Sequence, residues 1–155
     1  QESRFAAIRA VKLVSADGRE IGAAPTTEDV FIRIDVEVFK PVGLRGTVIV
    51  EARNLRLMRS EDTEFHAVQE PGFYSVFARI PANLLSDIHY SVTVSVNTLR
   101  EGETRQYTLV AYHALAFMAY ATENAGPNAK GKLGKASLLA PKLDWKVEAF
   151  SGVRA

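Results

Sequence analysis

The ten-residue segment Val30–Phe39 constrains the fold of this chain more than any other part of the sequence. Every second residue is apolar and β-branched, beginning at Val30 and ending at Val38, and the residues between them are charged or aromatic. Alternation with a period of two is typical of an antiparallel strand that buries one face and exposes the other. The segment therefore predicts a half-buried strand.

The same alternation recurs in Tyr90–Asn97, and further strand-forming segments follow along the chain. We expect these additional strands at Ile8–Val14, Thr47–Arg53, Phe73–Ile80, Tyr107–Ala111, Leu115–Ala119 and Asp144–Phe150. Turn residues such as Asp17-Gly18 and Pro71-Gly72 separate them. One helical turn is expected at Pro81–Asp87 and a mobile loop at 124–135. This pattern predicts an all-β fold, an antiparallel β-sandwich of the immunoglobulin-like or jelly-roll kind.

Size and charge limit the classes of protein to which the chain can belong. Its 155 residues fit one domain, 1–155. The formal net charge of +1 provides no basic surface for nucleic acid. With no cysteine, disulfides and thiol chemistry are excluded. The chain starts at Gln1, without methionine, so we expect a fragment of a longer protein, with residues 1–7 as a linker remnant.

A search for catalytic chemistry gives no candidate. The three histidines, His66, His89 and His113, do not have the spacing of metal ligands. Phosphate-binding glycine motifs and the GxSxG serine-hydrolase motif are absent from the sequence. Acidic residues at 28–29 and 61–64 resemble charged loops more than a glycosidase pair. We therefore expect no catalytic residue, metal or cofactor, and no enzyme activity.

Two rows of outward-facing strand residues are the candidate binding site. They are Phe31, Arg33 and Asp35 in the first row and Thr93, Ser95 and Asn97 in the second. An aromatic ring such as Phe31 can stack on a sugar ring, and the polar groups can bind its hydroxyls. A glycan-binding trough requires the two rows to adjoin. Alternatively, Phe31 packs beneath a loop or a partner subunit, and the polar row is an ordinary solvated face.

The order of these segments resembles that of a known family. Val11–Gly18 gives a first strand and its turn, and Pro71–Leu85 reads as "PG-x-Y-x-V" followed by "IP-x-N-L-L". Leu115–Phe117 precedes a loop, and Leu138–Trp145 closes the pattern. Over residues 8–148 this layout is similar to the C-terminal carbohydrate-binding domain of Wzt, the ATP-binding subunit of ABC transporters that export O-antigen polysaccharide.

The resemblance implies a function and a set of partners. The domain would bind O-antigen polysaccharide, often through its chain end, in the cytoplasm at the inner face of the inner membrane. A nucleotide-binding domain would precede it and a membrane subunit would accompany it. It would also form a homodimer by exchange of the C-terminal strand at 144–150, anchored by Trp145. Lys130, Lys132 and Lys135 would be solvent-exposed or face an anionic group on the glycan. The alternative is a structural or protein-interaction sandwich, such as an adhesin-like or immunoglobulin-like spacer.

Overall fold

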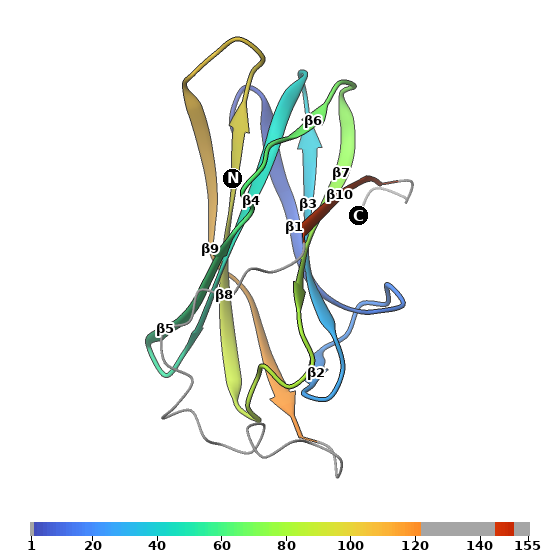
Figure 1. Cartoon of the computed structure of the whole chain (residues 1–155), viewed down its shortest axis with the longest axis vertical. Coiled ribbons are helices and arrows are strands. Elements are labelled where there is room, and N and C mark those ends of the chain that lie inside the picture. The colour runs from blue at the N-terminus through green and yellow to red at the C-terminus, as the bar shows by residue number, and fades with distance from the viewer. Residues whose placement is uncertain (1, 122–144, 151–155) are drawn as a thin grey trace.

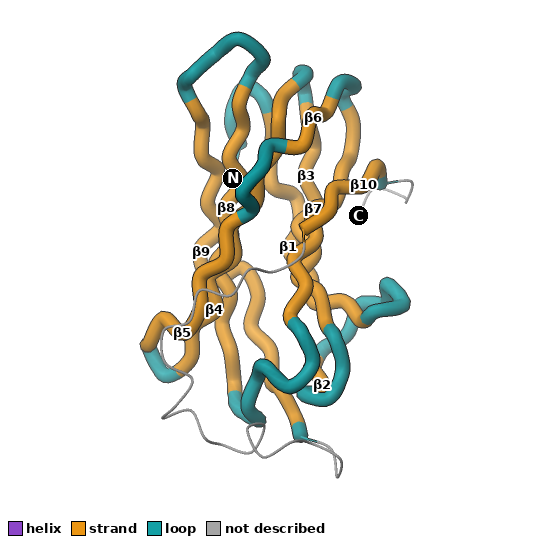
Figure 2. Tube along the Cα trace, viewed as in Figure 1, coloured by secondary structure: helices purple, strands orange, loops and turns teal. Residues whose placement is uncertain are grey.

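The alternating segment around Ile34 forms strand β3 (Val30–Val38), and its five inward-facing residues are each at most 1% exposed. The computed structural model describes residues 2–121 and 145–150, which form two β-sheets packed face to face (Figure 1). The predicted all-β sandwich is confirmed: the described residues form strands and connecting turns, with no helix among them (Figure 2).

The four-stranded sheet has the order β1-β3-β7-β10, and all its pairs are antiparallel. Besides β3, its strands are β1 (Ala6–Ser15), β7 (Gly72–Ile80) and β10 (Trp145–Ala149). We call it sheet A. Residues far apart in the sequence meet in it, because β10 pairs with β7 through Trp145 and Ala78.

The second sheet, sheet B, has the order β2-β9-β8-β4-β5, and β6 pairs with β4. Its strands are β2 (Ala23–Pro25), β4 (Val42–Ala52), β5 (Leu55–Glu61), β6 (His66–Val68), β8 (His89–Leu99) and β9 (Gln106–Tyr120). The pairing of β2 with β9 is parallel, and the other pairs are antiparallel. The hairpins β4–β5 and β8–β9 therefore build most of this sheet from local connections.

The hydrophobic core lies between the two sheets. On β8, the inward-facing Val92, Val94 and Val96 are fully buried opposite the inward face of β3. Alternation then leaves the intervening residues of both strands on the outer faces of the sandwich. The sandwich therefore presents two separate outer faces, one on each sheet.

The structure differs from the sequence prediction in several local features. Residues 81–87 form turns and not the expected helical turn. The two strands expected within 107–119 are one strand, β9, while β2, β5 and β6 were not predicted. Within the linker expected at 1–7, Phe5 is buried at 2% exposure and Ala6 and Ala7 belong to β1. The expected loop at 124–135 and its three lysines lie outside the described residues. No helix long and apolar enough to cross a bilayer occurs among the residues described.

Candidate functional site

The two predicted rows of binding residues lie on opposite sides of the molecule. Phe31, Arg33 and Asp35 project from β3 in sheet A, whereas Thr93, Ser95 and Asn97 project from β8 in sheet B. Their inward-facing neighbours fill the core between the sheets. The single trough expected from the sequence is therefore wrong, because the period-two pattern was correct for each strand but the strands belong to different layers.

On sheet A, the polar members of the predicted row are occupied by one another. Arg33 Nε lies 3.1 Å from Asp35 Oδ1, and both side chains are less than a fifth exposed, at 16% and 13%. Ser75 Oγ on β7 donates a 2.7 Å hydrogen bond to Asp35 Oδ1. The Arg33 guanidinium carbon lies 5.7 Å from the centre of the Phe150 ring. These contacts make the row a structural network joining β3, β7 and the residue after β10.

On sheet B, short polar side chains run along the middle of the outer face. In the pairing of β8 with β4, each outward-facing residue has a direct neighbour: Thr93 lies beside Ile49, Ser95 beside Thr47, and Asn97 beside Arg45. Thr108 Oγ1 on β9 donates a 2.6 Å hydrogen bond to Asn97 Oδ1. Because Thr47 and Thr93 are only 3% and 7% exposed, they lie low between longer neighbours. We call Thr93, Ser95 and Asn97 of β8, together with Arg45 and Thr47 of β4, the polar strip; the apolar Ile49 stands next to Thr93 at its edge.

A β-bulge in β9 places Tyr112 and His113 opposite Thr93 of β8. Val92 pairs with Leu115 and Val94 with Ala111, so three β9 residues face Thr93 alone. His113 has a left-handed φ of 46°, and its backbone N–H donates a 3.1 Å hydrogen bond to Thr93 Oγ1. The neighbouring Tyr112 is 72% exposed. Bulges and left-handed non-glycine residues are enriched at functional sites, where they redirect side chains.

A hollow of about 320 Å³ lies where β4 ends and β8 begins; these strand ends are at the bottom of Figure 1. It is lined by Glu51, Arg53, Asn54, His89, Ser91 and His113, together with less polar residues, and we call it the Ser91 hollow. A 2.9 Å hydrogen bond joins Ser91 Oγ to His113 Nδ1, and Glu51 Oε2 lies 3.7 Å from the same nitrogen. A nucleophilic triad needs serine and carboxylate on different imidazole nitrogens. This group therefore does not have the geometry of a nucleophilic triad.

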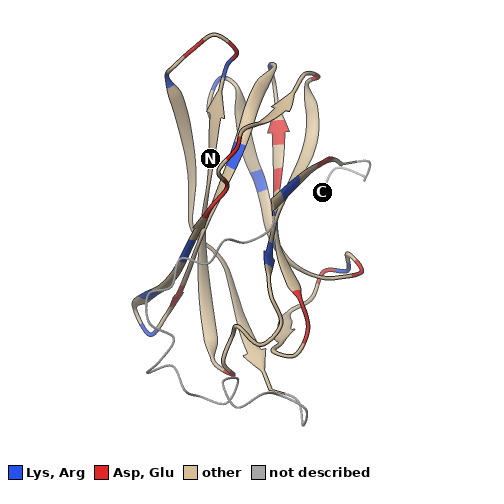
Figure 3. Cartoon of the chain, in the orientation of Figure 1, with Lys and Arg blue, Asp and Glu red and all other residues tan. Residues whose placement is uncertain are grey.

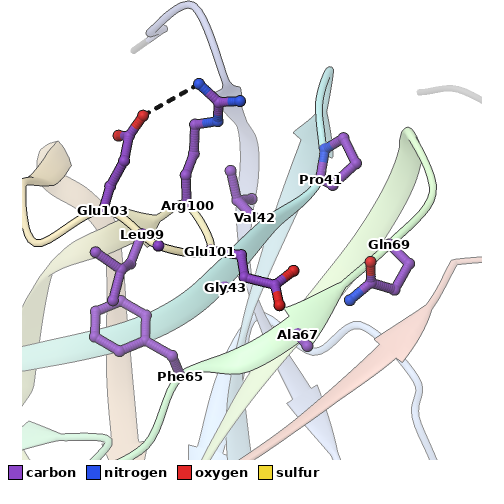
Figure 4. A pocket seen from close by; sticks show the side chains of 11 residues that line it. Pro41, Val42, Gly43, Phe65, Ala67, Gln69, Leu99, Arg100, Glu101 and Glu103 are labelled. Atoms are coloured by element: carbon purple, nitrogen blue, oxygen red, sulfur yellow. Dashed lines mark hydrogen bonds and ion pairs between the residues drawn. The ribbon is translucent and has the colours of Figure 1, made fainter.

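A second hollow, of about 340 Å³, lies at the other end of the strip, and we call it the Gly43 hollow (Figure 4). Gly43, Phe65, Ala67, Gln69, Leu99 and Glu101 are among its lining residues. Gly43 makes room for an aromatic ring, because a Cβ there would lie 3.0 Å from Phe65 Cβ. Figure 4 shows the Glu101 carboxylate directed towards Gln69 and away from the Arg100–Glu103 ion pair of 3.1 Å. An aromatic ring and two planar polar groups thus share this hollow.

Charge is mixed over the whole sandwich. Figure 3 shows acidic and basic residues on strands of both sheets and in the loops of the described part of the chain. Within the described ranges, no three His, Asp or Glu side chains gather as a metal site would require. The polar strip and its two hollows are therefore distinguished by shape and hydrogen-bonding groups, not by net charge.

Sequence reasoning found the middle of this face and missed its ends. Ser91, Thr93, Ser95 and Asn97 were visible as an alternating polar row. Tyr112 and His113 were not, because the bulge interrupts the alternation of β9 and looked like a gap between two strands. The one available signal in the sequence was His113, which lies between two apolar segments and indicates an interruption in the pairing of β8 with β9.

Comparison with known proteins gives a likeness at the level of structure. No family model matches the chain, and no curated protein matches it in sequence. Sixteen chains of solved structures are similar to it in fold. One of them, the C-terminal domain of Wzt, matches all of this chain and 86% of its own length with a TM-score of 0.62 and 10% identical residues. At that identity the likeness shows a shared β-sandwich fold.

Proposed function

We propose that this chain is a non-catalytic carbohydrate-binding domain that recognises O-antigen polysaccharide for an ABC exporter. One observation on the site carries the proposal: Tyr112, which is 72% exposed, directly precedes His113 in the bulge of β9, and His113 Nδ1 is hydrogen-bonded to Ser91 Oγ and lies 3.7 Å from Glu51 Oε2. An aromatic ring stacks on the apolar face of a sugar, and planar carboxylate and imidazole groups bind its hydroxyls. The fold shared with the C-terminal domain of Wzt supports the transporter context.

The binding surface in this proposal is the outer face of sheet B. Of the predicted row on β8, Thr93 and Asn97 are 7% and 9% exposed and are hydrogen-bonded to His113 and Thr108. Ser95 therefore stays in the proposed site as a contact for the ligand, with Tyr112 in place of Phe31 as the stacking ring. Arg33 and Asp35 are assigned to stability, since they already bind each other and Ser75. The absence of a triad geometry around His113 supports binding without turnover.

The proposal includes partners and a location. A nucleotide-binding domain on the same polypeptide and a membrane subunit would accompany the domain in the cytoplasm, at the inner face of the inner membrane. A homodimer would form by exchange of β10, so that Trp145 enters the partner subunit instead of its own sandwich. Light scattering during gel filtration tests this part: a strictly monomeric protein would contradict it.

Calorimetric titration with O-polysaccharide from the encoding organism tests the central claim. We expect Tyr112→Ala to weaken binding about tenfold, which corresponds to about 1.4 kcal/mol and to the upper range for an aromatic contact. A matched control removes an aromatic side chain from the other sheet: Phe31→Ala on sheet A. This variant should leave the affinity unchanged.

Two results would overturn the proposal. One is a folded wild-type protein that does not bind the polysaccharide. The other is a loss of binding in Phe31→Ala that equals or exceeds the loss in Tyr112→Ala. Specific binding of a protein partner, with no affinity for glycan, would favour the alternative of a protein-interaction sandwich.

A further inference from the structure

We infer that the Gly43 hollow is a second carbohydrate site, separate from the Ser91 hollow, and that it takes one sugar ring without an acidic group. The chain then binds sugars independently at the two ends of the outer face of sheet B. The inference rests on the proposed function in one respect, because it takes carbohydrate as the class of ligand. It adds a site that the proposed function does not use, and the charge of the sugar that fits there.

The floor of the Gly43 hollow is a row of three paired residues that crosses β6, β4 and β8. Gly43 pairs with Ala67 on one side and with Leu99 on the other. Because glycine and alanine carry almost no side chain, the surface of the sheet is low along this row. The hollow of about 340 Å³ lies over it, at the small end of the range of about 300–1,000 Å³ for ligand pockets. Two small residues at paired positions therefore create the space.

A side-chain barrier closes this hollow towards the Ser91 hollow. The next outward-facing residue of β4 after Gly43 is Arg45, whose guanidinium carbon lies 4.7 Å from the centre of the Phe65 ring. Arg45 Nη2 lies 3.1 Å from Glu61 Oε1 on β5 and donates a 3.2 Å hydrogen bond to Gln106 Oε1 on β9. Arg45 thus spans the sheet between the two hollows, so a sugar bound in one makes no contact with the other.

The walls of the Gly43 hollow supply an aromatic ring and two planar polar groups. Phe65, Gln69 and Glu101 all line it. Figure 4 shows the Glu101 carboxylate directed towards the Gln69 amide, with the Phe65 ring on the opposite side of the view. An aromatic ring packs on the apolar C–H face of a sugar, and amide and carboxylate groups bind its hydroxyls. The hollow therefore combines the two kinds of contact that a sugar ring requires.

One carboxylate sets the charge of the sugar that fits. Arg100 and Glu103 also line the hollow, but they form an ion pair of 3.1 Å and neutralise each other. Within the described ranges, no cation forms an ion pair with Glu101, whose carboxylate points away from Arg100 (Figure 4). A carboxylate without a cation attracts the ammonium group of an amino sugar and repels the carboxylate of an acidic sugar. The site therefore prefers hexosamines to neutral hexoses and rejects hexuronic acids.

Two matched substitutions each fill one hollow. Ala67→Leu places a larger apolar side chain on the floor of the Gly43 hollow. Ala116→Leu does the same in the Ser91 hollow, where Ala116 pairs with Ser91. Both alanines are exposed strand residues, so the larger side chain does not overpack the core. A third variant, Glu101→Gln, keeps the planar group and removes its charge. Thermal unfolding verifies that each variant is folded.

Amide NMR titration of the whole chain tests the inference. The probes for the Gly43 hollow are a hexosamine, the matching neutral hexose and the matching hexuronic acid, at a slightly acidic pH that keeps the amine protonated. Short oligosaccharides from the O-polysaccharide of the encoding organism are the probe for the Ser91 hollow. The signals of Gly43 and Leu99 report on the first hollow, and those of Ser91 and His113 on the second.

We expect the hexosamine and the hexose to shift the Gly43 signals to saturation, and the hexuronic acid to leave them in place. Ala67→Leu should weaken this response at least tenfold and spare the response at Ser91, and Ala116→Leu should do the reverse. Glu101→Gln should weaken hexosamine binding about tenfold, the order of a hydrogen bond to a charged group, and should admit the hexuronic acid.

The inference and the proposed function fail in different ways. If oligosaccharides shift Ser91 and no sugar shifts Gly43, the proposed function stands and the second site is wrong. If sugars shift Gly43 while the O-polysaccharide leaves Ser91 unmoved, the second site stands and the proposed function is wrong. A wild-type response at Gly43 in folded Ala67→Leu, or an equal loss at both hollows in Ala116→Leu, would contradict a separate site. Equal affinity for the hexuronic acid and the hexosamine would contradict the role of Glu101.

Discussion

The indole ring of Trp145 rests on the backbone of Gly46. A Cβ atom at Gly46 would lie only 2.6 Å from Cζ3 of Trp145 and 3.1 Å from Cγ1 of Val76. The contact crosses the sandwich, since Trp145 belongs to β10 of sheet A and Gly46 to β4 of sheet B. Only glycine leaves room for the ring, so this position fixes how the C-terminal strand packs against the opposite sheet.

We expect Gly46→Ala to destabilise the protein by about 1–3 kcal/mol, because the added methyl group overpacks the contact between the sheets. Trp145 is the sole tryptophan, so its fluorescence reports the displacement directly. Emission should shift to the red as the ring leaves its site. Gly22→Ala is the matched control, since a Cβ at Gly22 meets nothing within 4 Å. Equal unfolding midpoints for the two variants would contradict the contact as described.

Removing the carboxylate of Asp35 should lower stability and spare glycan binding. Asp35→Ala leaves the largely buried Arg33 without its ion pair and Ser75 without its acceptor. We expect a loss of about 1–3 kcal/mol in urea unfolding, the range for a buried polar group that loses its partner. Calorimetric affinity for the polysaccharide should be unchanged. A variant with wild-type stability and lost affinity would return the binding site to sheet A.

Two substitutions of His113 separate backbone strain from side-chain function. Both His113→Gly and His113→Ala remove the imidazole, but only glycine adopts a φ of 46° without a steric penalty. We therefore expect His113→Gly to be more stable than His113→Ala by about 1–2 kcal/mol. Both should weaken polysaccharide binding to the same extent. If His113→Ala were as stable as His113→Gly, the left-handed backbone at the bulge would not be strained.

The strands themselves were largely visible in the sequence, whereas their partners were not. The alternation in Val30–Phe39 and Tyr90–Asn97 correctly gave the buried faces of β3 and β8. A period of two fixes which residues face inward but not which layer a strand joins, because that depends on pairing between distant segments. Strand β5 was missed because its sequence, Leu-Arg-Leu-Met-Arg-Ser-Glu, alternates weakly at the edge of a sheet.

Stability should fall at high pH because of Tyr90. Burial of its ring raises the pKa of the Tyr90 hydroxyl above the ordinary 10.0. The folded state therefore keeps a proton that the unfolded state loses, so this stabilisation is complete below pH 10.0 and declines as the pH rises towards the higher folded-state pKa.

Tyr90→Phe should remove this component of the pH dependence. It also removes the hydrogen bonds between the Tyr90 hydroxyl and the backbone of Ser86, at 2.9 and 3.1 Å, which costs about 1 kcal/mol or more at neutral pH. Urea unfolding of wild type and variant between pH 8 and 11 measures both effects. Parallel curves across that range would show that Tyr90 keeps its proton equally in both states.

The long separation between β7 and β10 has a kinetic consequence. Pairing of Trp145 with Ala78 closes a far longer stretch of chain than the hairpins β4–β5 and β8–β9 do, and long closures slow folding. We expect β10 to dock last, onto a sandwich (its own or, in the proposed homodimer, that of the partner subunit) whose other strands have already paired. In stopped-flow refolding, Trp145 fluorescence should then recover more slowly than the circular dichroism of the strands, whereas identical rates would indicate that β10 folds together with the rest. The C-terminal strand would thus act as the final step of assembly, with a spectroscopic reporter at its own first residue.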